Sequence, residues 1–261
     1  MLEQYVSDAE YPDYYRKLNS LRSRIAAELP LRPDTCILDV ATGPGLFASE
    51  VAKRHSSLRI IGIDICQDDI RQARANLEKA NLTSRVEILR MDATQMAFPA
   101  GRFDLAVNFL GLEDIHMTRG KTGVQRTFIE VSRVLKPGSN FCFVVMPPEE
   151  METEAQKTEV ALFSYICNAT WLSAKEYETM AGKAGLKLIE KRSYYTGKKL
   201  SAEQAKVEIR FACDNVPRLY KTDTRPFEEA WARFGQSVSD NGLGHYSKTV
   251  LMTTQKVWNA E

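Results

Sequence analysis

The stretch from Ile37 to Ala48, ILDVATGPGLFA, decides how this sequence is interpreted. An apolar run reaches Asp39, and a loop with glycines at positions 43 and 45 follows it. Glycine has no Cβ, so the backbone can turn sharply there and approach a ligand closely. A helix that starts near Pro44 would direct its free N–H groups and positive dipole end toward that ligand. We therefore expect a polar or anionic ligand at the carboxyl end of this strand, where open α/β sheets bind their ligands.

Strand and helix patterns alternate around this stretch. Short apolar strands are expected at Cys36 to Val40, Arg59 to Asp64, Val86 to Arg90, Phe103 to Phe109 and Asn140 to Met146. Helical patterns lie between them, near Leu46 to Arg54, Asp68 to Ala80 and Thr122 to Leu135. The strands are rich in Val, Ile and Leu, which suits a sheet covered on both faces. Repeated β-α units predict an α/β fold with a doubly wound, mostly parallel sheet.

The two ends of the chain differ from this central part. A helical pattern covers Ser7 to Leu29, and a capped helix is expected from Ser173 to Ala184, followed by a strand from Leu186 to Tyr194. Residues 196–241 read as two amphipathic helices around a turn that contains proline, and the β-branched stretch HYSKTVLMTTQKVW predicts a last strand.

Composition excludes several classes of protein. The chain has 261 residues and a net charge of +1, so no overall field attracts it to nucleic acid or to anionic lipid. Its five cysteines form no C-x-x-C pair and its three histidines are dispersed, which favours reduced thiols and predicts no metal site. Neither a signal-like apolar segment at the N-terminus nor a run of 18 apolar residues occurs, so we expect a cytoplasmic protein without a membrane span.

The glycine loop alone does not identify the ligand. Gly43-x-Gly45-x-x-Ala48, with Asp64 further on, also satisfies the dinucleotide fingerprint of a nicotinamide oxidoreductase. Tyr194-x-x-x-Lys198 even imitates the tyrosine–lysine pair of short-chain dehydrogenases, but Gly197 interrupts it and it falls at the end of a strand.

The acidic residues shift the balance away from a dinucleotide. The carboxylate of Asp39, four residues before Gly43, would repel a pyrophosphate and hold an ammonium group. Asp92 directly follows the third strand and adds another acid, beside Asp64, at the same edge of the sheet.

Four ordered blocks carry a resemblance to a known family. ILDVATGPG, IIGIDI, VEILRMDATQMAFPAGRFDLAV and EVSRVLKPGSNFCFVV resemble class I S-adenosylmethionine-dependent methyltransferases of the type 11/25 kind, from about Thr35 to Val145. Ala41 stands where the usual first block has a glycine, and DVATG looks more like the quinone-biosynthesis C-methyltransferases. The resemblance implies a seven-stranded Rossmann-like fold. It also implies methyl transfer from S-adenosylmethionine, with S-adenosylhomocysteine as the product.

The same resemblance implies how the cofactor is held. Asp39 and the backbone around the loop would face its methionine part, Asp64 would accept hydrogen bonds from both ribose hydroxyls, and Asp92 would face the adenine amino group. An ionised carboxylate only accepts hydrogen bonds, so it suits a diol or an amine. The cofactor-binding residues expected are Asp39, Ala41, Thr42, Gly43, Gly45, Asp64, Ile65, Met91, Asp92, Ala93 and Asn108.

Structural explanations exist for the same residues. Asp39 could merely cap a turn, Asp64 and Asp92 could start helices, and Ile65 and Met91, the expected adenine walls, could be core residues. Three acids at the ends of three successive strands, together with the glycine loop, favour the functional interpretation.

The acceptor side is harder to interpret. A sulfonium methyl group is already electrophilic, so the protein mainly has to align an acceptor atom behind it for in-line displacement, and it needs a base only if the acceptor loses a proton. The segment NFLGLEDIHMTRGKTG lies where this family often lines the acceptor pocket. Its Glu113, Asp114 and His116 are therefore catalytic candidates, as a base or as the charge complement of an amine. The alternative is that they are solvated residues at the start of a helix.

The expected partner is a small-molecule acceptor. The aromatic residues of 196–241 suit a helical core stripe and also a cap over a compact, partly apolar acceptor, while NFLG lacks the Asn/Asp-Pro-Pro-aromatic block of enzymes that methylate adenine or cytosine in nucleic acids. Three N-terminal tyrosines could form a lid or simply pack on the domain: Tyr11, Tyr14 and Tyr15.

These expectations define one methyltransferase domain over residues 1–261. It consists of an N-terminal helical segment (1–33), a cofactor-binding core (34–147) and a substrate side (148–261) whose cap spans about 196–241. We expect a monomer or a homodimer. A cofactor-binding sensor or scaffold without turnover, an RNA methyltransferase and a nicotinamide oxidoreductase are the alternatives.

Overall fold

A seven-stranded sheet forms the centre of the molecule. The computed structural model describes residues 3–220, 223 and 225–257, with the backbone alone for residues 14–17, 219 and 220. The strand order is β4-β3-β2-β5-β6-β10-β7. The strands are β2 (Cys36–Val40), β3 (Arg59–Asp64), β4 (Val86–Arg90), β5 (Phe103–Phe109), β6 (Leu135–Val145), β7 (Leu186–Tyr195) and β10 (Lys248–Lys256). Strands β2 to β6 pair in parallel, and β10 runs antiparallel to both of its neighbours. The predicted doubly wound, mostly parallel sheet is confirmed.

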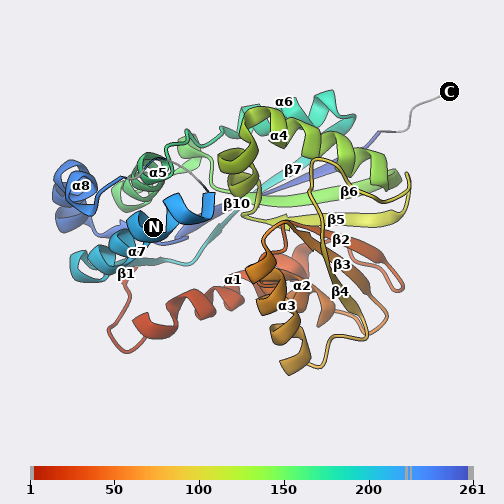
Figure 1. Cartoon of the computed structure of the whole chain (residues 1–261), viewed down its shortest axis with the longest axis horizontal. Coiled ribbons are helices and arrows are strands. Elements are labelled where there is room, and N and C mark those ends of the chain that lie inside the picture. The colour runs from red at the N-terminus through yellow and green to blue at the C-terminus, as the bar shows by residue number, and fades with distance from the viewer. Residues whose placement is uncertain (1–2, 221–222, 224, 258–261) are drawn as a thin grey trace.

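Helices cover both faces of this sheet. On one face lie α1 (Tyr14–Glu28), α2 (Leu46–Ala52) and α3 (Gln67–Lys79), and on the other lie α4 (Leu112–Val134) and α6 (Ala174–Lys183) (Figure 1). Side chains alternate between the faces of a strand. Ile37 accordingly belongs to the core beneath the first set of helices, whereas Leu38 belongs to the core beneath the second.

A third group of helices gathers at one end of the molecule, on the left of Figure 1. It contains α5 (Glu154–Ile166), α7 (Ala202–Tyr220) and α8 (Phe227–Asn241). A small sheet accompanies it, in the order β1 (Gln4–Tyr5), β8 (Lys198–Leu200) and β9 (Leu243–Gly244). Because β1 pairs with β8, the beginning of the described chain is tied to the segment that precedes α7. The two helices expected within 196–241 are present, while α5 and the small sheet were not predicted.

Several element boundaries differ from the predicted ones. Helix α1 begins at Tyr14, after the 3-10 helix Tyr11–Asp13, rather than at Ser7. Helix α2 begins at Leu46, where its helical pattern was predicted to begin, because Gly45 adopts a left-handed conformation (φ 73°) just before it, and it ends at Ala52 rather than Arg54. Helix α4 begins at Leu112 instead of Thr122. It is broken at Gly120 (φ 65°, ψ −175°), so its first turns do not continue the helical pattern that was predicted from Thr122. Strand β6 then begins at Leu135, earlier than expected.

Short 3-10 helices complete the described elements, at Tyr11–Asp13 (η1) and Pro148–Glu150 (η2). None of the helices described has the length and apolar character needed to cross a membrane. In the same part of the chain, no group of three or more His, Cys, Asp or Glu side chains is arranged to hold a metal ion.

Candidate functional site

The glycine loop after β2 owes its shape to left-handed backbone. Ala41 (φ 50°), Gly43 (φ 52°) and Gly45 (φ 73°) all have positive φ. A Cβ on Gly45 would lie 3.1 Å from the Cβ of Ala73 in α3, so α3 can pack closely only because this residue is glycine. A Cβ on Gly43 would meet nothing within 4 Å. The loop therefore packs tightly on one side and leaves open space on the other.

Asp64, the last residue of β3, ties this loop to the neighbouring strand. Its Oδ2 accepts a hydrogen bond from the N–H of Gly43 (2.9 Å), and its Oδ1 accepts one from the N–H of Cys66 (2.9 Å). A carboxylate oxygen has two lone pairs, so both oxygens can still accept hydrogen bonds from ligand hydroxyls. Both oxygens of Asp64 can therefore take part in the expected ribose contact, which stays a prediction.

Asp39 lies beneath the loop rather than on its surface. Its side chain is only 1% exposed, and Thr42 Oγ1 donates to its Oδ2 (2.5 Å). Burial raises the pKa of Asp39 to about 7, the hydrogen bond from Thr42 opposes this rise, and the charge of Asp64 adds to it. Buried and with a raised pKa, Asp39 repels a pyrophosphate less strongly than the ionised, accessible carboxylate expected from the sequence. Through Thr42, Asp39 shapes the loop.

Asp92 follows β4 and forms the third acid of the edge. Its Oδ1 accepts from the N–H and the hydroxyl of Thr94 (2.8 and 2.7 Å), and its Oδ2 accepts from Arg119 Nη2 (3.0 Å). Burial acts to raise the pKa of Asp92, but the bonds from Thr94 and Arg119 outweigh it and hold the pKa below its usual value. Arg119, which directly precedes the break in α4 at Gly120, was not predicted as a partner of Asp92.

The expected adenine walls differ in exposure. Ile65, next to Asp64, is 47% exposed, which is unusual for an isoleucine at the end of a buried strand and fits a ligand wall. Met91 and Ala93, on either side of Asp92, pack against the core beneath α4 and α6.

Asn108 joins the glycine loop to the beginning of α4. It is fully buried and donates from Nδ2 to the carbonyl of Val40 (2.7 Å), while its Oδ1 has no hydrogen-bond partner among the described residues. A Cβ on Gly111 would lie 2.6 Å from the Cβ of Ala41 and 2.7 Å from Asn108 Nδ2. The residues that start α4 therefore press directly against the loop.

The three catalytic candidates in α4 differ in burial: Glu113 is buried, whereas Asp114 and His116 are partly exposed. Glu113 is 6% exposed and accepts at Oε1 from the N–H of Met146 (3.0 Å), directly after β6, while its Oε2 is buried with no hydrogen-bond partner in the described structure. Burial raises the pKa of Glu113 to about 7, with the bond from Met146 opposing and the charge of Asp114 adding. His116 is half-buried one turn on, and burial and Lys121 lower its pKa. Glu113 is thus the candidate that reaches the ends of the central strands.

Of the three lid tyrosines, only Tyr11 has a described side chain. Its hydroxyl donates to Glu208 Oε1 (2.8 Å) and to the carbonyl of Gln204 (3.3 Å), so it ties η1 to α7. The side chains of Tyr14 and Tyr15 lie outside the described part of the chain. The lid therefore stays a prediction.

An apolar cluster beyond the ends of β5 and β6 was not predicted. It consists of Leu110, Met146, Met151, Val160, Trp171 and Tyr246, and we call it the acceptor-side cluster. Its members come from the loops after β5 and β6, from α5, from the loop between α5 and α6, and from the loop before β10. No local sequence pattern links them.

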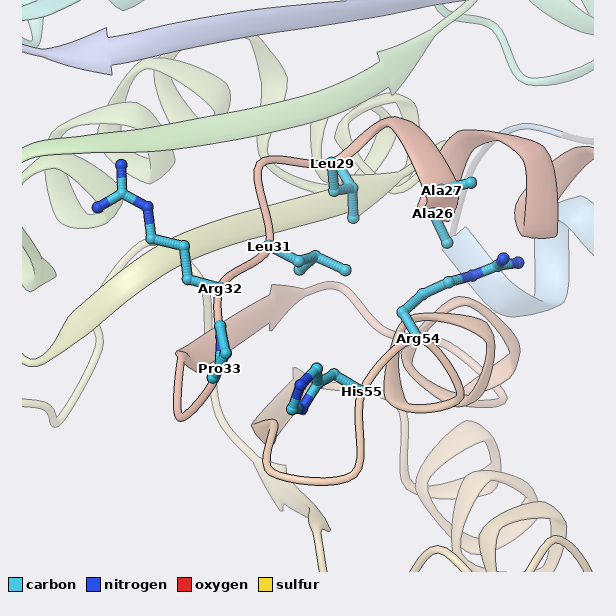
Figure 2. Close-up of a pocket in the computed structure, with 8 residues that line it drawn as sticks. All are labelled: Ala26, Ala27, Leu29, Leu31, Arg32, Pro33, Arg54 and His55. Atoms are coloured by element: carbon cyan, nitrogen blue, oxygen red, sulfur yellow. The ribbon is translucent and has the colours of Figure 1, made fainter.

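A separate hollow of about 320 Å³ lies away from this edge (Figure 2). It is lined by Ala26, Ala27, Leu29, Leu31, Arg32, Pro33, Arg54 and His55. Three of these residues come just before β2, whereas the glycine loop follows β2, so the hollow lies at the opposite end of that strand. It contains no acid and none of the predicted site residues.

Comparison with known proteins gives a match over the core. Residues 37–138 match the family model described as a methyltransferase domain. A 24-methylenesterol C-methyltransferase 2 of Oryza sativa subsp. japonica is 35% identical over 115 residues, which are 44% of this chain and 30% of that protein. A demethylmenaquinone methyltransferase of Bacteroides fragilis is 30% identical over 111 residues, or 42% of each chain. The chain therefore spans less than half the length of these relatives.

Solved structures match over nearly the whole chain. The cyclase SpnF superposes with a TM-score of 0.65 at 18% identity and covers 99% of this chain and 88% of its own. A putative methyltransferase from Bacillus halodurans C-125 gives 0.63 at 21% identity, with 92% and 99% covered. Such identities show the fold alone. The match of residues 37–138 to the methyltransferase-domain model covers the glycine loop and its neighbouring acids, so this part of the chain is similar to a methyltransferase domain.

Proposed function

We propose that this protein transfers a methyl group from S-adenosylmethionine to a small-molecule acceptor, leaving S-adenosylhomocysteine. The observation that carries the proposal is the open loop at Gly43, whose N–H is held by Asp64 at the edge that also bears Asp92. In this proposal the loop backbone faces the methionine part, Asp64 accepts from the ribose hydroxyls and Asp92 accepts from the adenine amino group. The residues present fit that cofactor, because both acids offer acceptor oxygens and the loop at Gly43, bonded to Asp64, borders open space.

The cofactor supplies the electrophilic methyl group, and the chain has to align the acceptor and manage its proton. Alignment alone contributes several kcal/mol, up to roughly 7–11 kcal/mol in ideal cases. Glu113 is the proposed base, because its pKa is raised to about 7 and its Oε2 has no other partner in the described structure. Such a group exists in both protonation states near neutral pH, which suits proton transfer. Glu113 is preferred to Asp114 and His116 because its buried carboxyl is held at Met146, directly after β6.

Three observations support a small-molecule acceptor. Sequence relatives are named for sterol and menaquinone methylation, the acceptor-side cluster is apolar, and helices α5, α7 and α8 cover that end of the molecule (Figure 1). The near-zero net charge gives no support to a nucleic-acid substrate. A cytoplasmic location, and a monomeric or homodimeric state, are part of the same proposal.

Calorimetry with S-adenosylhomocysteine tests the cofactor site. We expect the intact protein to bind it and Asp64→Asn to weaken binding by about 10- to 100-fold, because a hydrogen bond to a charged group contributes roughly 1.5–3 kcal/mol. Asp68→Asn, an exposed neighbour on α3, is the matched control and should bind normally. No binding by the intact protein would refute the proposal. Because a cyclase shares this fold, turnover has to be shown separately, by formation of S-adenosylhomocysteine from S-adenosylmethionine.

A further inference from the structure

Helix α7 exposes two large apolar side chains to solvent. Val207 is 56% exposed and Phe211 is 63% exposed, the two highest values among the large hydrophobic residues that the structure describes. They lie four positions apart, so they are neighbours on one side of the helix. The other exposed large hydrophobics lie singly on separate elements, which is ordinary for a protein surface: Tyr5, Ile65, Ile129, Ile189 and Val257.

The two residues belong to a stripe of exposed side chains that runs along α7. Neighbouring members of the stripe are mostly three or four positions apart, which keeps them on one face of the helix. We call this set the α7 stripe, and its members are Glu203, Val207, Arg210, Phe211, Asp214 and Arg218. The opposite face of α7, with Ala205, Ile209 and Ala212, is buried in the core.

The α7 stripe lies between two segments that pack on α7, at one end of the molecule (Figure 1). On one side, the hydroxyl of Tyr11 in η1 donates to Glu208 Oε1 (2.8 Å). On the other side, Cζ of Arg210 lies 4.0 Å from the ring centroid of Phe227 in α8. These contacts hold the two edges of the stripe, and within the described chain its apolar centre stays uncovered.

The charges of the α7 stripe match those of a reversed copy of the same stripe. Glu203 and Arg218 are equally far, about 11 Å, from the midpoint between Arg210 and Phe211, because a helix rises 1.5 Å per residue. In two antiparallel copies related by a two-fold axis at that midpoint, Glu203 therefore lies level with the partner's Arg218. The symmetry makes this contact twice. Phe211 lies beside the axis, where it meets the partner's Phe211.

A partner of a single charge sign fits the α7 stripe less well. Two acids and two arginines give the stripe no net charge, so it has no overall attraction for an anionic membrane or for nucleic acid. The acid at one end and the arginine at the other favour a partner in which the order of charges is reversed. A second copy of this chain, turned end to end, has that order.

We propose that the α7 stripe is the contact surface of a homodimer, in which α7 packs antiparallel on α7 of a second copy about a two-fold axis. This inference does not depend on the proposed methyl transfer. One helix face from each copy makes a small interface, so we expect a reversible dimer with a dissociation constant in the micromolar range.

Sedimentation velocity over a wide range of protein concentration tests for this dimer. We expect the wild type to shift from monomer to dimer as its concentration rises. Phe211→Glu should weaken association by at least about tenfold, because it removes the central apolar contact and places two acids at the axis. Ile129→Glu, which removes an exposed isoleucine from α4, is the matched control and should associate like the wild type. Both positions are exposed, so both variants should keep the wild-type circular dichroism spectrum.

Two charge reversals test the antiparallel arrangement. In a dimer of Glu203→Arg, two arginines face each other at both ends, and in a dimer of Arg218→Glu two glutamates do. Each variant alone should therefore associate about tenfold more weakly than the wild type. In an equimolar mixture of the two variants, both contacts again join an acid and an arginine, so association should return to nearly the wild-type strength.

Three results would overturn the inference. They are a wild type that stays monomeric well above micromolar concentration, a dimer that survives Phe211→Glu, and a mixture of the two charge variants that associates no better than either variant alone. Phosphatidylcholine vesicles supply a last comparison. If the wild type is monomeric and sediments with these vesicles while Phe211→Glu does not, the α7 stripe faces a lipid surface and the homodimer is refuted.

Discussion

The cofactor edge, which is the sheet edge that carries the glycine loop, Asp64 and Asp92, differs from the acceptor-side cluster in how its carboxyl groups are hydrogen-bonded. At the cofactor edge, both oxygens of Asp64 and both oxygens of Asp92 have partners within the chain. At the cluster, Glu113 and Glu159 each have one oxygen bonded to the backbone and one without a hydrogen-bond partner in the described structure. The edge is therefore preorganised, whereas the cluster is electrostatically incomplete by itself. A preorganised site suits a cofactor common to many enzymes, and an incomplete one suits a substrate that differs from one enzyme to the next.

Glu113→Gln should have the largest effect, because it removes the ionisable carboxyl of Glu113 at the acceptor-side cluster. We expect kcat to fall by about 10²- to 10⁴-fold, the usual contribution of a positioned base. Because the pKa of Glu113 is raised to about 7, the wild-type rate should rise with pH up to about 7 and then level off. The variant should lose that rise. The check is the pH dependence of S-adenosylhomocysteine formation with any acceptor that the wild type methylates. An unchanged profile would exclude Glu113 as the base.

Gly45→Val should disrupt the glycine loop at the cofactor edge. The new side chain would meet Ala73 and would also have to adopt φ 73°, so α3 and the loop cannot keep their positions. We expect a loss of roughly 2 kcal/mol or more in the free energy of unfolding, together with loss of S-adenosylhomocysteine binding. Chemical denaturation and calorimetry measure the two effects.

Gly182→Ala is the matched glycine control. A Cβ there meets nothing within 4 Å, and the residue lies inside α6. It should stabilise the protein by about 0.5–1 kcal/mol without changing binding. Equal effects of the two substitutions would mean that the loop is not specially constrained.

The cofactor edge could be predicted because its signals are local in the sequence. Strands β2 to β5 begin and end at the predicted residues, since each is a short apolar run followed by loop residues. Asp64 and Asp92 follow such runs directly, so their common edge is a consequence of parallel order. The burial of Asp39 could not be predicted in this way. Asp39 also lies at the end of an apolar run, but the fold places it under the loop, where burial raises its pKa to about 7.

The acceptor-side cluster could not be predicted because its contacts are distant in the chain. Glu159 and Tyr246 are separated by 87 positions, and Glu113 and Met146 by 33. Helix α5, which carries Glu159, attracted no prediction at all. No sequence pattern marks a buried oxygen that lacks a hydrogen-bond partner, because the oxygen is buried only when segments distant in the chain pack together.

Stability should depend on pH more strongly than the balanced composition suggests. Burial raises the pKa of Asp39 and Glu113 to about 7 and of Glu159 to about 8, so the folded state binds more protons than the unfolded state. The free energy of unfolding should therefore fall as pH rises from 6.5 to 8, by roughly 1.4 kcal/mol per pH unit for each group still protonated. His245, whose pKa burial lowers to about 4, acts in the opposite direction only below 6.5.

Urea denaturation across that window measures the slope, and Glu159→Gln is the informative variant. Removing the titrating group while keeping its shape should flatten the slope most clearly between pH 7 and 8, where Glu159 acts nearly alone. A wild-type stability that is level from 6.5 to 8 would mean that these carboxyls are not buried in solution as they are in the structure.

Arg119→Ala should have the smallest effect, and it tests how Asp92 is held at the cofactor edge. Arg119 occupies one lone pair of Asp92 Oδ2, which leaves a second lone pair for the adenine amino group, so the arginine orients the carboxylate without blocking it. Arg119 also places a guanidinium donor beside the carboxylate acceptor of Asp92. This pair complements adenine, whose amino group donates and whose neighbouring ring nitrogen accepts. The pair is partly exposed, and such pairs contribute about 0.2–1 kcal/mol, so S-adenosylhomocysteine should bind up to about fivefold more weakly. Arg126→Ala, an exposed residue of the same helix, should bind normally. Tighter binding by Arg119→Ala would show instead that the arginine competes with adenine for Asp92, and the cofactor edge would then be closed in the free protein rather than preorganised.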